Sequence, residues 1–172
     1  MQIKERSYET ITIEDLKKLR NLALRERIKF FERNPRYREA YWNSLIGIAL
    51  CQGAALHFID CETGVKDFDI WYFYIKSDQL EYPYRACKSV DSKFDKFGTH
   101  PVDAKKGYKG RRVDLMGRAI DIRRYNKSDP KGCVIEYLRR QKTKTAQELT
   151  KKAIIGLWPK AILGKVIWPV KL

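Results

Sequence analysis

The sequence feature that most constrains the fold is a run of apolar residues that starts immediately after two acids. From Asp67 to Ile75 the chain reads DFDIWYFYI, and beyond Asp69 apolar side chains occupy both odd and even positions. Successive side chains of a β-strand point to opposite faces, so a strand of this composition must be covered on both sides. We therefore expect a central strand in a sheet with helices packed on it, which is an α+β (α/β) fold.

Periodic apolar residues predict further elements on both sides of this strand. Thr12 and Asp15 have the spacing of a capping box, and apolar side chains at helical spacing follow over residues 13–33. Asn34-Pro35 is expected to end that helix, because the residue before a proline disfavours the helical conformation. The remaining pattern predicts helices over 36–44, 54–59, 132–141 and 145–157, strands over 45–50 and 111–122, and loops or a hairpin over 76–110.

The length of the chain indicates one domain. With 172 residues and 44% hydrophobic content it can bury one sizeable core. We expect residues 45–125 to form that core, residues 1–44 to form an N-terminal helical segment packed on it, and residues 126–172 to form a C-terminal helical segment and tail. The tail contains two Trp-Pro steps, so a regular helix through all of it is not expected.

An uncharged stretch of twenty residues, 40–59, has the length of a membrane span. Polar side chains at Asn43, Ser44, Gln52 and His57 interrupt it. A buried strand followed by a buried helix explains the stretch better, so we expect no membrane partner.

Cysteine usage bears on the compartment. The four cysteines, Cys51, Cys61, Cys87 and Cys133, form neither a CxxC pair nor a zinc-finger spacing with histidine, and no signal peptide is expected before them. A reduced, cytoplasmic protein is the simplest interpretation.

The chain is strongly basic, and its acids gather in one stretch. The net charge is +15; residues 43–104 carry 6 Lys and Arg against 9 Asp and Glu, whereas residues 105–142 carry 13 against 4. A positive field attracts phosphate-bearing partners such as nucleotides and RNA. A basic surface that only aids solubility remains the alternative, because net charge alone specifies no partner.

The two acids Asp67 and Asp69 stand two residues apart at the start of the predicted central strand. On a strand they project to the same face, about 6 to 7 Å apart. Carboxylates in that arrangement resist ionisation unless a positive charge lies between them, and Mg²⁺ binds one or two carboxylates together with water and phosphate oxygens. Asp114, in the run RRVDLMG, would complete a site for metal, an attacking hydroxyl and a nucleotide phosphate if its strand is a neighbour.

A structural role for these acids is the alternative. Asp67 could close a turn and Asp69 could pair with a surface lysine, and a lone DxD motif is common. The apolar surroundings of Asp69 and Asp114 favour a site, because burying an unpaired carboxylate is costly.

Three segments in order, ALCQGAALHF, TGVKDFDIWYFY and GRRVDLMGR, resemble the nucleotidyltransferase fold, especially its small stand-alone members of the minimal and abortive-infection toxin type. In that family a strand leads into a Gly-Gly or Gly-Ser turn and a helix, a DxD strand follows, and a third Asp lies on a neighbouring strand. The resemblance covers roughly residues 45–118 and implies a nucleotidyltransferase-like mixed β-sheet. It implies that Asp67 and Asp69 bind Mg²⁺ or Mn²⁺, that Asp114 assists the metal or activates the attacking hydroxyl, and that an NTP is the substrate.

The same resemblance implies that the turn formed by Gln52, Gly53 and Ala54 faces the phosphates. Gln52 stands where the family has its first glycine, and Ala54 stands where the family has Gly or Ser. A turn whose amides hold a phosphate prefers small residues, although the side-chain amide of Gln52 can itself donate to a phosphate.

Basic side chains flank the three acids and are candidates for binding phosphate. They are Lys66, Lys109, Arg111, Arg112 and Arg118, of which Lys66, Arg112 and Arg118 are the preferred nucleotide-binding candidates. Arginine suits bidentate contacts with phosphate. Solvated surface charge is the alternative for each of them.

Histidine and tyrosine side chains are further candidates. His57 is expected to be a core or rim residue of a helix rather than a catalytic one. Tyr82 and Tyr84 could stack on a base, whereas the aromatic residues 72–74 are expected in the core because of the strand they occupy.

Three functions remain open on the sequence. The first is a metal-dependent nucleotidyltransferase that moves an NMP group from an NTP to a hydroxyl of RNA, including tRNA, or of a protein. The second is a catalytically degenerate protein of the same fold that binds nucleic acid or a partner such as an antitoxin. A metal-dependent nuclease ranks third, because Tyr74 stands where the acid of a D…ExK motif would be.

Overall fold

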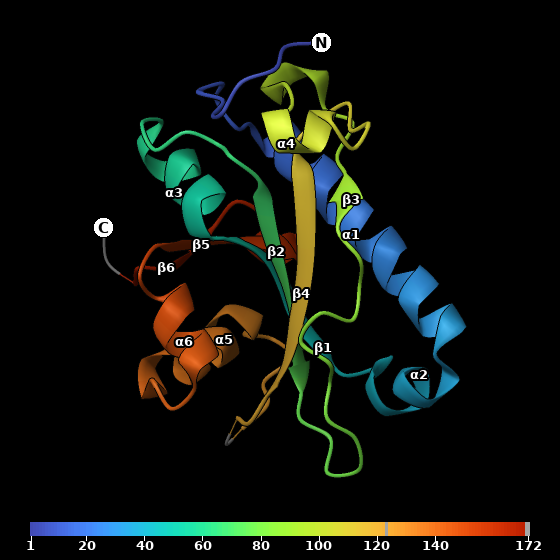
Figure 1. Ribbon diagram of the computed structural model, residues 1–172. Coiled ribbons are helices and arrows are strands. Elements are labelled where there is room, and N and C mark those ends of the chain that lie inside the picture. The colour runs from blue at the N-terminus through green and yellow to red at the C-terminus, as the bar shows by residue number, and fades with distance from the viewer. Residues whose placement is uncertain (123, 171–172) are drawn as a thin grey trace.

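The computed structural model describes residues 1–122 and 124–170, and within these residues the strands form one six-stranded mixed sheet with helices packed on it (Figure 1). The strand order is β3-β4-β2-β1-β5-β6. This is the α+β class that the sequence predicts. The strands are β1 (Leu45–Cys51), β2 (Phe68–Ile75), β3 (Val90–Asp91), β4 (Arg112–Ile120), β5 (Ala153–Trp158) and β6 (Val166–Trp168). The helices are α1 (Ile13–Arg33), α2 (Pro35–Tyr41), α3 (Gln52–Asp60), α4 (Pro101–Ala104), α5 (Pro130–Arg140) and α6 (Lys144–Leu149), with 3₁₀ turns η1 (Asp95–Phe97) and η2 (Lys160–Ile162).

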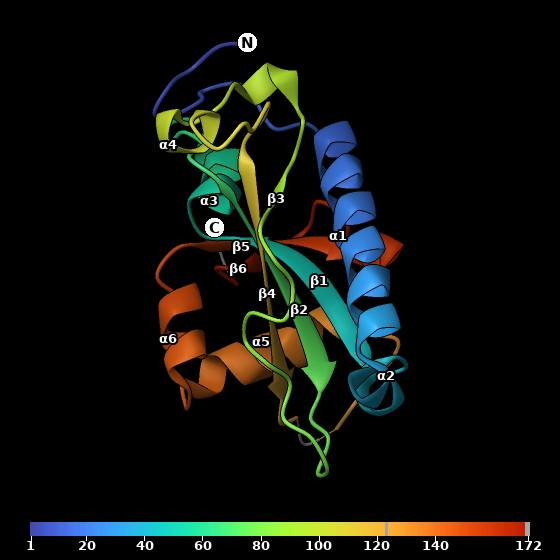
Figure 2. The same ribbon diagram turned by 45° about the vertical axis from the view of Figure 1, so that its right-hand side comes forward.

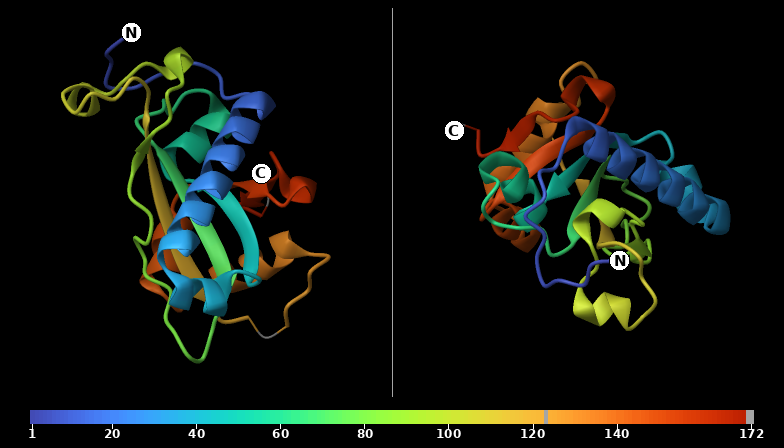
Figure 3. Two further views of the ribbon diagram at one scale, coloured as in Figure 1. Left: turned by 90° about the vertical axis from the view of Figure 1, so that its right-hand side faces the viewer. Right: turned by 90° about the horizontal axis from the view of Figure 1, so that it is seen from above.

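Strand β2 is central and covered on both faces, as its composition requires. It pairs antiparallel with β1 and parallel with β4. Alternate side chains such as Ile70 and Tyr72 pack in the cluster that contains α1, whereas Trp71 and Phe73 pack in the cluster that contains α5 and α6. Figures 2 and 3 show α1 on one side of the sheet and α5 and α6 on the other.

Helix α1 has the bounds predicted from the sequence. The capping box is present, because the Asp15 amide donates to the Thr12 hydroxyl over 3.2 Å and the Thr12 amide donates to the Asp15 carboxylate over 2.8 Å. Asn34 ends the helix before Pro35 begins α2. The apolar face of α1 buries Leu16, Leu19 and other residues against the sheet, which accounts for its amphipathic pattern.

The C-terminal segment differs from the prediction. The helix predicted over 145–157 ends at Leu149, and residues Ala153–Trp158 form β5, which pairs antiparallel with β1. The described part of the C-terminal segment 126–172, up to residue 170, therefore contains strands as well as the helices α5 and α6, because β5 and β6 complete the sheet. The sequence AIIGLW is apolar on both parities, and all but its last residue are buried, so both faces are covered. Ala146, Leu149 and Ala153 fit a helical period as well, which explains the error.

The segment expected to be loops or a hairpin, 76–110, contains three short elements. They are β3, the 3₁₀ turn η1 and helix α4. Helix α4 starts where the side chain of His100 accepts from the Val102 amide and Pro101 takes the first helical position, a favoured place for proline. These elements bring Asp103 close to the start of β4.

The uncharged residues 40–59 divide among the end of α2, strand β1 and helix α3. In the part of the chain that the structure describes, no helix has both the length and the apolar character needed to cross a bilayer.

Candidate functional site

The three predicted acids meet at the start of two parallel strands. Asp69 on β2 and Asp114 on β4 are direct partners in the parallel register, so their backbones lie about 4.8 Å apart. Asp67 precedes β2 by one residue. Figure 1 shows this end of β2 and β4 next to α3 and α4. Two segments that are distant in the sequence thus place their carboxylates on one face of the sheet, the face that carries Trp71.

Arg112 lies among these acids. Its guanidinium donates to the Asp67 carboxylate over 2.8 Å and to the Asp114 carboxylate over 3.1 Å. Its side chain is 28% exposed. Burial works against the charge, but the carboxylates around it outweigh burial and raise the pKa of Arg112 above its ordinary value. The arginine therefore acts as the counter-charge of the cluster.

A fourth acid, Asp103 on α4, belongs to the same cluster and was not identified from the sequence. One of its oxygens lies 3.6 Å from the Arg112 guanidinium, and its side chain is only 3% exposed. That oxygen has no hydrogen-bond donor among the described residues. A buried carboxylate oxygen without a donor is costly, so the cluster holds more negative charge than Arg112 neutralises.

Asp69 carries the clearest electrostatic stress. Burial raises the pKa of its carboxyl to about 7, and the neighbouring Asp67 and Asp114 act in the same direction. The charges of Arg112 and Lys152 oppose this shift. Over residues 1–122 and 124–170, the Asp69 side chain has no ion pair within 4 Å. Lys152, which directly precedes β5, is a second residue that the sequence did not identify, because β5 itself was not predicted.

The turn from β1 into α3 adjoins the acids. Cys51, the last residue of β1, pairs with Asp69, and Gln52 follows it. Gln52 has φ = 61°, in the left-handed region that favours glycine. Its side-chain amide donates to the Glu148 carbonyl over 3.4 Å. The backbone amides of Gly53 and Ala54 open α3, whose N-terminal end carries the positive part of the helix dipole.

The other predicted basic residues divide between this site and elsewhere. Lys66 is exposed next to Asp67, and Lys109 is exposed before β4. Arg111 is fully buried and donates to backbone carbonyls, including that of Phe97 over 3.0 Å, so it holds loops together and is not available to phosphate. Arg118 lies four residues along β4 from Asp114 and is not part of the acidic cluster.

The structure also shows where the histidine and aromatic candidates lie. His57 is fully buried, where it bridges the Glu9 carbonyl and the Gly64 amide, so its role is structural. Tyr72 and Tyr74 are core residues, as expected for the strand they occupy. Tyr82 is buried and stacks on Tyr74, with the two ring centroids 4.5 Å apart, whereas Tyr84 is 49% exposed.

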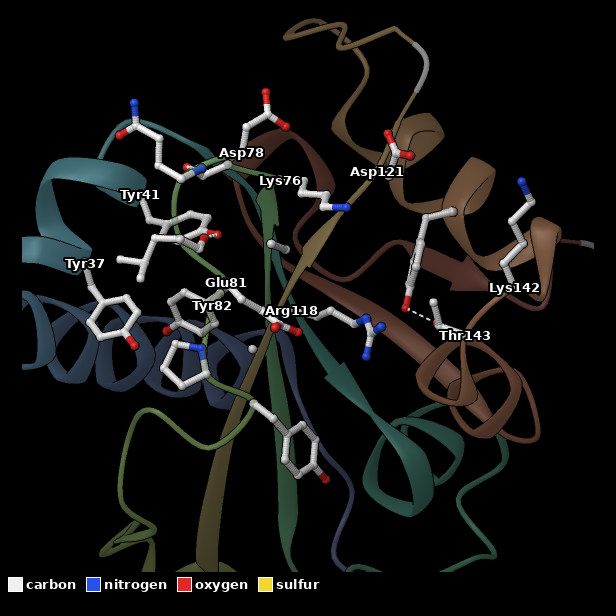
Figure 4. A pocket seen from close by; sticks show the side chains of 18 of the residues that line it. Tyr37, Tyr41, Lys76, Asp78, Glu81, Tyr82, Arg118, Asp121, Lys142 and Thr143 are labelled. Atoms are coloured by element: carbon white, nitrogen blue, oxygen red, sulfur yellow. Dashed lines mark hydrogen bonds between the residues drawn. The ribbon is translucent and has the colours of Figure 1, made fainter.

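A cavity of about 880 Å³ lies away from the acids, at the opposite end of β4. Figure 4 shows its lining, in which Arg118 and Thr143 approach from different elements. Neither the acidic cluster of Asp67, Asp69, Asp103 and Asp114 nor the turn at Gln52 contributes to its lining. The acidic cluster remains the better candidate for chemistry, because its buried charges are not fully neutralised.

The donor set at the acidic cluster suits a hard divalent cation, which prefers carboxylate oxygens. As the side chains stand, no three of the described His, Cys, Asp or Glu side chains are arranged as a metal site. Arg112 accounts for this, because Asp67 and Asp114 are turned toward its guanidinium. The donor-free oxygen of Asp103 and the raised pKa of Asp69 indicate that the cluster can accept additional positive charge.

Comparison with known proteins adds no relative. Searches against protein families, curated proteins and solved structures each found no match.

Proposed function

We propose that the protein is a metal-dependent nucleotidyltransferase that moves an NMP group from an NTP to a hydroxyl of RNA or of a protein and releases pyrophosphate. The observation that carries this proposal is the parallel register that sets Asp69 beside Asp114, next to the turn that opens α3. The arrangement agrees with the resemblance of residues 45–118, in which a DxD strand lies between the phosphate turn and the strand of the third acid.

Each part of the cluster has a role in this proposal. Asp67, Asp69 and Asp114 would hold Mg²⁺ or Mn²⁺, and Asp103 adds negative charge behind them. The ion would supply positive charge to the phosphates of the NTP. The amides of Gly53 and Ala54 at the start of α3 would bind the phosphates, since a helix N-terminus favours anions.

Basic side chains would complete the nucleotide site. Arg112 can turn from the carboxylates to a phosphate, because more than a quarter of its side chain is exposed. Lys66, next to Asp67 in the sequence, and Lys152, whose charge acts on Asp69, are both exposed and would contact a bound triphosphate. Asp114 accepts a hydrogen bond from Ser89, which would keep its carboxylate in position to assist the metal or to activate the attacking hydroxyl.

A catalytically degenerate protein of the same fold is the second candidate function. The contacts of Arg112 with Asp67 and Asp114 favour it, since a permanent arginine counter-charge would replace a metal. Gln52 favours it too, because its side-chain amide is engaged with the Glu148 carbonyl. Such a protein would use its basic surface to bind RNA or a protein partner such as an antitoxin. The cytoplasm, where NTPs and RNA are abundant, is the proposed compartment for both functions.

A transfer assay with α-labelled NTPs tests the enzyme directly. Total cellular RNA and total protein serve as acceptors, and incorporation of label is measured with Mg²⁺, with Mn²⁺ and with EDTA. We expect label to require metal and to be lost in Asp67→Ala. Full transfer by Asp67→Ala would refute the assignment, and binding of RNA without any transfer would favour the degenerate protein.

A further inference from the structure

The cavity at the far end of β4 lies along an open edge of the sheet. Strand β3 pairs only with Arg112 and Val113 at the start of β4. Beyond them, residues 76–84 run past the strand, and the Gly117 amide donates to the Tyr84 carbonyl over 3.0 Å. The segment that joins α5 to α6 forms the opposite wall. The cavity of about 880 Å³ is therefore framed by loops from both halves of the chain.

Charges of both signs line this cavity. The cations are Lys76, Arg118, Arg140 and Lys142, and the acids are Asp78, Glu81 and Asp121. Arg118 is held by one hydrogen bond to the Thr145 hydroxyl, over 2.9 Å. Figure 4 shows its guanidinium in the space between Glu81 and Thr143. A ligand that fits here must supply negative charge and also hydrogen-bond donors.

Tyrosines supply flat apolar surface in the same place. Tyr84 is 49% exposed, and its ring lies 5.5 Å from that of Trp71, which supports it from behind. Tyr37 lines the cavity as well and is partly exposed, whereas Tyr137 lines it but is buried. The Tyr137 hydroxyl is hydrogen-bonded to Thr143 over 2.6 Å, which fixes the position of that ring. A supported, partly exposed aromatic ring, such as that of Tyr84, is a surface on which an unpaired base stacks.

We propose that this cavity binds unpaired nucleotides of a single-stranded RNA, which is the acceptor of the proposed transfer reaction. Single-stranded RNA offers phosphates to Lys and Arg, flat bases to aromatic rings, and amino and 2′-hydroxyl groups to carboxylates. The mixed lining matches all three groups, whereas a bare phosphate would leave the cavity acids without partners. The assignment as acceptor rests on the proposed function; the RNA site itself does not.

The position of the cavity suits an acceptor. Asp114, Met116 and Arg118 occupy alternate positions of β4 and so share one face of the sheet. Arg118 lies four positions along β4 from Asp114, a span of roughly 13 Å. Met116, between them, is buried under the helices of that face, so a strand of RNA held at Arg118 would pass outside it to reach the acidic cluster. Residues 105–142, which carry 13 Lys and Arg against 4 Asp and Glu, supply β4 and one wall of the cavity.

Fluorescence anisotropy of a short labelled oligoribonucleotide of mixed sequence tests the proposal. The titrations are made in EDTA at several salt concentrations, so that the acidic cluster and its metal play no part. Arg118→Gln and Tyr84→Ala are compared with the wild type. The matched controls are Arg25→Gln, which removes the same charge from exposed α1 on the other face, and Tyr84→Phe, which keeps the ring.

We expect Tyr84→Ala to weaken binding by at least about fivefold, because each stacked base contributes strongly to affinity. Tyr84→Phe should bind as the wild type does. Arg118→Gln should lower the slope of log Kd against log salt by about 0.7, the value for one phosphate of a single strand. Arg25→Gln should leave the slope unchanged. Thermal unfolding of each variant verifies that it is folded.

Several outcomes would overturn the proposal. Equal binding by the wild type, Tyr84→Ala and Arg118→Gln would place RNA on another surface. Displacement of the oligonucleotide by free NTP in EDTA at similar concentrations would assign the cavity to a mononucleotide. Equal affinity for the matching deoxyoligonucleotide would remove the preference for RNA. Asp69→Asn should bind the RNA as the wild type does. Its metal-dependent NTP binding tests the proposed function, so a failure of that function is distinguished from a failure of the RNA site.

Discussion

Replacement of Arg112 by glutamine gives a direct measure of the charge stored in the acidic cluster. Glutamine keeps much of the side-chain volume and removes the positive charge. In metal-free protein the change breaks two charge-assisted hydrogen bonds, to Asp67 at 2.8 Å and to Asp114 at 3.1 Å, and removes the cation nearest to Asp103. We expect Arg112→Gln to be less stable than the wild type in EDTA.

The magnitude follows from the partial burial of the pair. A hydrogen bond to a charged group contributes about 1.5 to 3 kcal/mol, and an unpaired buried charge costs several kcal/mol. Solvent reaches the guanidinium, which is 28% exposed, and reduces this effect. We expect a loss of about 2 to 4 kcal/mol at about pH 8, which lowers the melting temperature by roughly 4 to 16 °C for a chain of this length. Arg25→Gln, on exposed α1, should change stability by less than about 0.5 kcal/mol.

The response to metal separates a cation site from a purely structural pair. Urea denaturation of the wild type and Arg112→Gln is measured in EDTA and in Mn²⁺. Because Arg112 occupies the carboxylates that a cation needs, Mn²⁺ should stabilise the variant more than the wild type and recover most of the loss. A variant as stable as the wild type in EDTA, or one that Mn²⁺ does not stabilise, would refute the inference that these acids bind a cation.

Two further predictions concern Asp69 and the turn at Gln52. The pKa of Asp69 is about 7 in the folded protein, above its ordinary 3.8, so the unfolded chain releases this proton at lower pH than the folded protein does. The free energy of unfolding of the metal-free protein should therefore fall between about pH 4 and 7, by up to about 1.4 kcal/mol per pH unit. Urea titrations of Asp69→Asn should lack this fall. Gln52 has φ = 61°, so Gln52→Gly should leave the free energy of unfolding unchanged or raise it by up to about 1 kcal/mol. Gln147→Gly, inside helix α6, should lower it by about the same amount. A loss of unfolding free energy in Gln52→Gly as large as that in Gln147→Gly would contradict the left-handed backbone conformation at residue 52.

Local sequence signals predicted the elements that they can determine. Thr12 with Asp15 and the Asn34-Pro35 step fixed both ends of α1, because caps and proline act on the neighbouring backbone. The run from Asp69 to Ile75 predicted a buried central strand, since its composition requires cover on both faces. The spacing of Asp67 and Asp69, together with the resemblance of residues 45–118, led to Asp67, Asp69 and Asp114 as one group, on the condition that their strands are neighbours.

Features that depend on distant contacts were not accessible from the sequence. The pattern around Ala153 fits a helix and a strand equally well, and only pairing with β1 selects the strand. Lys152 was missed for that reason. Asp103 lies in a polar segment without periodicity, and its place beside Arg112 depends on how residues 76–110 fold over the start of β4. Arg111 and Arg112 are neighbours with opposite orientations, and the strand register alone decides which of them meets the acids.

We infer that the acidic cluster binds an NTP through a divalent cation. Isothermal titration calorimetry with each NTP in turn, in Mg²⁺ and in EDTA, tests it on the wild type and on a variant with both Asp67→Asn and Asp69→Asn. We expect a binding heat for at least one NTP that requires metal and disappears in the variant. No metal-dependent heat with the wild type, or an equal heat with the variant, would contradict it.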